Sequence, residues 1–135
     1  MAEVILPRVL VNQLLGHAQH SPEEEVCGLI GSTGEEGFSV YPVTNVAAEA
    51  DHLFAMAPQE QIDAMRRMRE NGEQLFAIYH SHPHAPAEPS LRDLDEAAYP
   101  EALYLIISLN TKGVLEMRGY RLHQGRVESV DLHLP

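Results

Sequence analysis

The most informative stretch of the chain is an apolar run that stops at two histidines and is followed by three prolines: Tyr79-His80-Ser81-His82-Pro83-His84-Ala85-Pro86-Ala87-Glu88-Pro89-Ser90-Leu91-Arg92-Asp93. In an extended segment, residues i and i+2 point to the same face, so His80 and His82 direct two imidazoles toward one point while Ser81 faces away. The prolines remove backbone donors and restrict the residues before them. The stretch therefore predicts a strand that is followed at once by the paired histidines, then a turn, then a helix.

The predicted helix supplies a third candidate ligand. Ser90 is placed where an N-cap belongs, and Asp93 is at the third helical position, where its carboxylate can face back toward the histidines. Two imidazoles and a carboxylate suit one Zn²⁺ ion, and three protein ligands leave a fourth position for water, as in catalytic sites. On this local pattern alone, two other interpretations stay open: Ser90 and Asp93 as a simple capping pair, and His80, His82 and His84 as a fortuitous surface cluster.

A second element bears on this choice, Glu23-Glu24-Glu25-Val26-Cys27-Gly28-Leu29-Ile30-Gly31. Hydrolysis at a metal site needs a general base near the attacking water, usually a carboxylate that does not bind the metal. Glu25 lies immediately before an apolar strand and is the candidate base, whereas Glu23 and Glu24 are expected on a solvated face. Cys27 is a possible nucleophile, but its strand position beside Gly28 favours a packed core thiol.

Taken together, Glu25, His80-x-His82 and Ser90-x-x-Asp93 resemble the motif of the JAMM (MPN+) metalloprotease family, which is Glu, His-x-His, ten residues and Asp. Ten residues separate His82 from Asp93 here. The resemblance covers nearly the whole chain. It implies that His80, His82 and Asp93 bind zinc, that Glu25 is the acid/base, and that Ser90 helps to stabilise the tetrahedral intermediate.

The resemblance also implies a function. Family relatives that remove ubiquitin carry insertions and additional domains that grip the ubiquitin pair, whereas this chain looks like the minimal prokaryotic form. Small members of this kind are associated with ubiquitin-like sulfur-carrier proteins, so the implied reaction is hydrolysis of an amide bond at a Gly-Gly tail. The alternative is a catalytically inactive MPN-type scaffold that only binds partners; such members have lost ligands, and this chain retains them.

Composition narrows the classes of partner. The 135 residues suit one domain, spanning 1–135. A formal net charge of −11, from 20 acidic and 9 basic residues, argues against nucleic acid and anionic membrane partners. A single cysteine excludes an internal disulfide, and the sequence shows neither a signal segment nor a long apolar span, so a cytoplasmic protein is expected.

The order of elements predicts an α/β fold, with a curved mixed sheet flanked by two longer helices and one short helix. The family resemblance implies the same architecture, an MPN-type fold. The longer helices are expected from Pro7 to about His20 and from Pro58 to Gly72, the second with Ile62 facing inward. The short helix is expected from Ser90 to about Ala98. The expected strands cover residues 3–6, 26–30, 38–43, 52–56, 74–79, 102–109, 114–122 and 127–134, and turns at 110–113 and 123–126 connect the last three.

Overall fold

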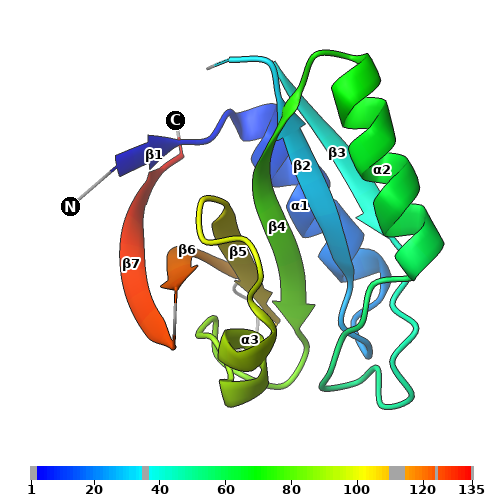
Figure 1. Ribbon diagram of the computed structural model, residues 1–135. Helices are drawn as coiled ribbons and strands as arrows, with labels where there is room; N and C mark the ends of the chain where they lie inside the picture. Colours follow the sequence, from blue (N-terminus) through cyan, green and yellow to red (C-terminus); the bar gives the residue numbers. More distant parts are fainter. Residues whose placement is uncertain (1–2, 35–36, 110–114, 124, 135) are drawn as a thin grey trace.

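A computed structural model describes residues 3–34, 37–109, 115–123 and 125–134 (Figure 1). These ranges form one curled, mixed seven-stranded sheet with the strand order β1-β7-β6-β5-β4-β2-β3 and three helices, which confirms the predicted fold class. The β1–β7 and β4–β5 pairs are parallel, and the other pairs are antiparallel. The helices are α1 (Arg8–His20), α2 (Pro58–Glu70) and α3 (Leu91–Glu96). The strands are β1 (Glu3–Ile5), β2 (Cys27–Ser32), β3 (Phe38–Val43), β4 (Gln74–His82), β5 (Leu103–Ser108), β6 (Glu116–His123) and β7 (Arg126–His133).

Helices cover both faces of the sheet, and the central strand β5 shows why its sequence is apolar throughout. Leu103, Leu105 and Ile107 pack in the cluster that contains the buried residues of α1. Tyr104 and Ile106 pack in the cluster on the opposite face, which contains the buried residues of α2. Alternate residues of a strand point to opposite faces, so a strand covered on both sides has no polar side.

The same alternation along β4 sets the direction of the two histidines. Tyr79 belongs to the cluster beneath α1 and Ile78 to the cluster beneath α2, so His80 and His82 share the face of Ile78. Both histidines lie within β4, which continues three residues beyond its predicted end at Tyr79. The strand is extended because β2 and β5 pair with it on either side, with β5 still paired at His82.

Two sequence predictions on the α2 face are wrong. Residues 52–56 do not form a strand; within them Met56 makes only an isolated bridge to Asn45. Ile62 does not face inward, because 59% of it is exposed, and Ala64 and Met68 are the buried residues of α2. Residues 64 and 68 are one helical turn apart, and Ile62 lies well around the helix from that stripe.

The predicted turns near the C-terminus have different outcomes. The turn expected over residues 110–113 lies outside the described residues. Between β6 and β7, Gly125 has a φ of 74°, a left-handed conformation that glycine adopts without a steric penalty. This agrees with the predicted turn at residues 123–126, of which Gln124 is outside the described residues.

Candidate metal centre

The structure brings the three predicted ligands to one point at the end of β4. The Nε2 atoms of His80 and His82 are 3.1 Å apart, and Asp93 Oδ2 lies 3.2 Å and 3.3 Å from them. Tetrahedral sites with metal bonds of about 2.0–2.1 Å place neighbouring ligand atoms about 3.3 Å apart. The spacing of these three donors therefore fits a single metal ion bound by all of them.

Asp93 is both a capping residue and a neighbour of the histidines. Ser90 is the N-cap of α3: its Oγ accepts a hydrogen bond from the Asp93 backbone N–H at 3.0 Å. In return, the Ser90 backbone N–H donates to Asp93 Oδ2 at 2.8 Å. The oxygen that faces the two imidazoles is thus held by the capping box, so the capping interpretation and the ligand geometry hold together.

The proline-rich segment between β4 and α3 orients His82. The Nδ1–H group of His82 donates to the Pro86 carbonyl at 2.8 Å. The carbonyls on either side of Pro86 accept hydrogen bonds from Ser108 and Tyr120 at 2.7 Å and 2.6 Å. A proton on Nδ1 leaves the Nε2 lone pair of a neutral imidazole free to bind a metal. No sequence pattern indicated this support.

Strand register places Glu25 beside the histidines. In the antiparallel β2–β4 pair, Cys27 is opposite His80, and the Val26 carbonyl accepts a hydrogen bond from the Ser81 backbone N–H at 3.0 Å. Continuing this register puts Glu25 next to His82, on the same face of the sheet. Glu25 is only 5% exposed, and one of its carboxylate oxygens lies within 4.8 Å of ring nitrogens of both histidines.

Burial and charge perturb each ionisable group at this centre. Burial raises the pKa of Glu25 to about 7, against the opposing effect of His82. Burial would also raise the pKa of Asp93, but hydrogen bonds from His80 and His82 hold it well below its usual range. Burial lowers the pKa of His80, whereas for His82 the bonds to Asp93 and Pro86 overcome burial and raise its pKa. The centre thus combines a carboxylate held ionised with a second carboxyl group poised near neutral pH.

The remaining candidates lie outside the metal centre. The side chain of His84 is 62% exposed and its Nε2 is 4.0 Å from the Glu23 carboxylate, so it does not converge with the other two histidines. Cys27 is fully buried, and burial raises the pKa of its thiol to about 12. The thiol is therefore protonated near neutral pH, which supports the core interpretation over the nucleophile.

Phe54 contacts the centre, although no sequence pattern singled it out. Its ring stacks on the imidazole of His80 with a centroid separation of 4.5 Å and an interplanar angle of 23°. It comes from the segment between β3 and α2, which lies near the end of β4 in Figure 1. The segment therefore forms one wall of the metal centre.

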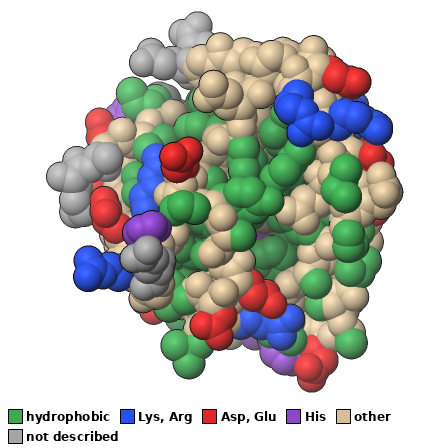
Figure 2. Space-filling model, viewed as in Figure 1, with side chains coloured by type: hydrophobic (Ala, Val, Ile, Leu, Met, Phe, Trp, Pro, Cys, Tyr) green, Lys and Arg blue, Asp and Glu red, His purple; other side chains and the backbone are tan. Residues whose placement is uncertain are grey.

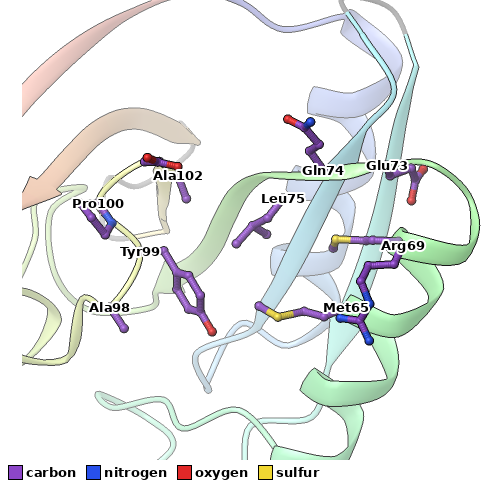
Figure 3. A pocket seen from close by; sticks show the side chains of 11 residues that line it. Met65, Arg69, Glu73, Gln74, Leu75, Ala98, Tyr99, Pro100 and Ala102 are labelled. Atoms are coloured by element: carbon purple, nitrogen blue, oxygen red, sulfur yellow. The ribbon is translucent and has the colours of Figure 1, made fainter.

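A hollow of about 500 Å³ opens on the same face of the sheet, at the start of β4. Met65 of α2, Leu75 of β4 and Tyr99 of the segment before β5 line it, and Figure 3 shows these side chains around the space. Hydrophobic side chains gather over the middle of this face in the space-filling view (Figure 2). The hollow contains none of the candidate ligands, but it shares β4 with them.

No helix in the described ranges is long and apolar enough to cross a membrane.

Comparisons with known proteins agree with this geometry. Residues 7–122 match the family model for prokaryotic homologs of the JAB domain. The chain is 33% identical over 122 residues to the CysO-cysteine peptidase of Mycobacterium tuberculosis, covering 87% of this chain and 82% of that protein. It is 32% identical over 103 residues to the desampylase of Haloferax volcanii, covering 72% and 74% of the two chains.

A solved structure shows the same fold. A JAB1/MPN domain protein from Archaeoglobus fulgidus aligns over 98% of each chain with a TM-score of 0.58 and 16% sequence identity. At this identity the likeness concerns the fold alone. Since the family model spans most of the sequence and the candidate metal residues meet at the end of β4, the chain belongs to the prokaryotic JAB domain family, of the JAMM type.

Proposed function

We propose that this JAMM-type metallopeptidase uses one zinc ion to hydrolyse the amide bond that follows the Gly-Gly tail of a ubiquitin-like carrier protein. The observation that carries the proposal is the convergence of His80, His82 and Asp93 on one point, with the buried Glu25 carboxyl group beside them. An inactive scaffold would have no need to keep a buried carboxyl group next to three metal donors, because burial of an ionisable group costs stability.

Each residue of the centre has a separate task in this proposal. His80, His82 and Asp93 hold the ion, whose nitrogen and oxygen donor set is typical of zinc. Zinc, when bound, acts as a Lewis acid that makes a water molecule acidic near neutral pH. Glu25 takes up the proton of the attacking water on its carboxylate and returns it to the leaving amine.

The substrate tail is proposed to lie along β4. Leu75 and His80 are five residues apart on the same strand, which is about 16 Å. An extended tail of about five residues covers that distance, so a tail whose last glycine is at the metal centre reaches the apolar hollow. Glycines suit the centre itself because they bring no side chain against the Phe54 ring that packs on His80. The names of the relatives support this class of substrate: one is a CysO-cysteine peptidase and another a desampylase.

Cleavage of a defined carrier adduct tests the proposal. The substrate is a small ubiquitin-like carrier ending in Gly-Gly that is joined through its C-terminal carboxyl group to the amine of cysteine. Mass spectrometry should show release of the free Gly-Gly carrier, loss of that activity with a chelator, and recovery with added zinc. Because the net charge of the enzyme is −11, added salt should weaken binding of a carrier with a basic face.

A linked pair of ubiquitins is the comparison substrate, and it should be cleaved slowly. Rapid cleavage of that pair, with no action on the carrier adduct, would reject carrier processing and leave the metal mechanism standing. A protein that retains no zinc would favour the scaffold interpretation instead.

Ser90 is proposed to assist the reaction in addition to capping α3. Its Oγ accepts a bond from the Asp93 N–H, so its own hydroxyl proton remains free to donate to a developing oxyanion. Ser90→Ala should cost about 1 kcal/mol of stability through the lost cap and lower turnover by at least roughly 10-fold. Thermal unfolding and steady-state kinetics measure the two effects, and Ser90→Thr, which keeps cap and hydroxyl, is the control. Unchanged turnover in Ser90→Ala would limit this residue to capping.

A further inference from the structure

The two histidines of the metal centre are oriented in different ways. The Nδ1–H of His82 donates to a backbone carbonyl, the usual means of fixing a metal-binding imidazole. The Nδ1 atom of His80 is fully buried and has no hydrogen-bond partner among the described residues. The polar contacts of His80 are therefore all on its Nε2 side, with Asp93 and His82, and the Nδ1 side of the ring depends on packing.

Phe54 is the group that contacts the face of that ring. The two rings are stacked 4.5 Å apart between centroids, so a shift of Phe54 changes the space in which His80 can rotate. Phe54 lies outside any helix or strand. Two backbone hydrogen bonds hold its neighbours, from the Leu53 N–H to the Glu49 carbonyl at 3.0 Å and from the Val46 N–H to the Ala55 carbonyl at 2.8 Å. These two bonds leave the Leu53 carbonyl and the Ala55 N–H to be paired by a side chain.

Asn45 adds side-chain bonds to both backbone neighbours of Phe54. Its Nδ2 donates to the Leu53 carbonyl at 2.9 Å, and its Oδ1 accepts from the Ala55 N–H at 3.0 Å. The Oδ1 atom also accepts from the Ala47 N–H at 3.0 Å. One amide side chain thus fixes the backbone immediately before and after the stacked ring.

The fourth hydrogen bond of Asn45 is made to the backbone of Glu25, the candidate base. Nδ2 also donates to the backbone carbonyl of Glu25 at 2.9 Å. The four bonds use both N–H donors and both acceptor positions of the amide. We propose that Asn45 is a positioning residue of the metal centre, fixing Glu25 through its backbone and His80 through the stacked ring of Phe54. The inference rests on the proposed function for its catalytic meaning.

Two substitutions separate the effect of Asn45 on Glu25 from its effect on His80. Asn45→Asp keeps the bonds that Oδ1 accepts but places an oxygen against the carbonyls of Leu53 and Glu25. The bonds to both carbonyls are therefore lost, and neither Glu25 nor Phe54 is held by this side chain as in the wild type. Phe54→Leu removes only the stack. Zinc affinity, measured by competition with a chromophoric chelator, should fall about 10-fold or more in both variants, the loss typical of outer-shell changes. At saturating zinc, turnover should fall roughly 10-fold further in Asn45→Asp than in Phe54→Leu, because only Asn45→Asp also releases the backbone of Glu25.

Matched controls exclude general damage. Asn12→Asp makes the same charge change at an exposed position of α1, and Phe38→Leu removes an aromatic contact with Phe76 from the α1-side cluster. Both should retain zinc affinity within about twofold, and Phe54→Tyr, which keeps the stack, should as well. The losses of zinc affinity caused by Asn45→Asp and Phe54→Leu should not be additive in the double variant, because both substitutions act on His80 through the ring of residue 54. Full additivity, or wild-type affinity in both single variants, would overturn the inference.

A readout on metal-free protein keeps this result separate from the proposed function. The NMR ring-proton shifts of His80 should lose the ring-current effect of Phe54 in Phe54→Leu, and should move in the same direction in Asn45→Asp although Phe54 is still present. The ring protons of His17, on the other face of the sheet, should not move. Unchanged His80 shifts in Asn45→Asp would overturn the inference whether or not the protein binds zinc, whereas wild-type protein that fails to bind zinc would count against the proposed function alone.

Discussion

Glu25→Gln is expected to lower turnover by roughly 100-fold or more while the metal stays bound. The amide keeps the size of the carboxyl group but cannot accept the proton of the attacking water. Zinc retention follows because Asp93, rather than Glu25, makes the direct contacts with both imidazoles. Turnover of the carrier adduct and zinc content of the same preparation measure the two effects.

Glu23→Gln and Glu24→Gln are the matched controls for this prediction. Both residues are exposed, in contrast to Glu25, which is buried beside the histidines. The controls remove the same charge from the same acidic run and should leave turnover close to that of the wild type. An active Glu25→Gln enzyme would end the assignment of the general base. Loss of zinc in that variant would instead make Glu25 a ligand.

The convergence of the site could be predicted from sequence because each part depends on short-range geometry. His80 and His82 share a face through the two-residue period of a strand, and Asp93 faces back because a capping box has a fixed three-residue spacing. Glu25 is far away in the chain, so only the family resemblance linked it to the histidines. The structure explains the link through the antiparallel pairing of β2 with β4.

The supports of the site could not be predicted in this way. Phe54 and Asn45 act from a segment without regular secondary structure, and the residues predicted there as a strand make only one isolated bridge. The Pro86 carbonyl that holds His82 is a backbone group with no sequence signal. The buried face of α2 could not be predicted either. Ala64 and Met68 pack against the sheet, whereas the apolar Ile62 is exposed.

The largest effect on metal binding is expected from removal of a ligand. His80→Ala or Asp93→Ala should leave the purified protein without zinc and without activity. Each of these side chains is within 3.3 Å of two other donor atoms, so its loss removes one of the three proposed bonds to the ion. The fall in affinity should exceed the roughly 10- to 100-fold loss that accompanies removal of an outer-shell partner. Metal content by elemental analysis, after purification without chelators, measures the effect.

His84→Ala is the control, because this histidine belongs to the same proline-rich stretch but its side chain is 62% exposed. It should keep one zinc ion per chain and full turnover. His80→Ala leaves a cavity in the core, because His80 is buried, and this cavity destabilises the protein. His82→Gln, which removes another proposed ligand but leaves a smaller cavity, is therefore included. Circular dichroism shows whether each protein is folded. Folded His80→Ala and Asp93→Ala proteins that still carry one zinc ion per chain would place the metal elsewhere. An empty site in His84→Ala would show that the ligand set has been assigned to the wrong histidines.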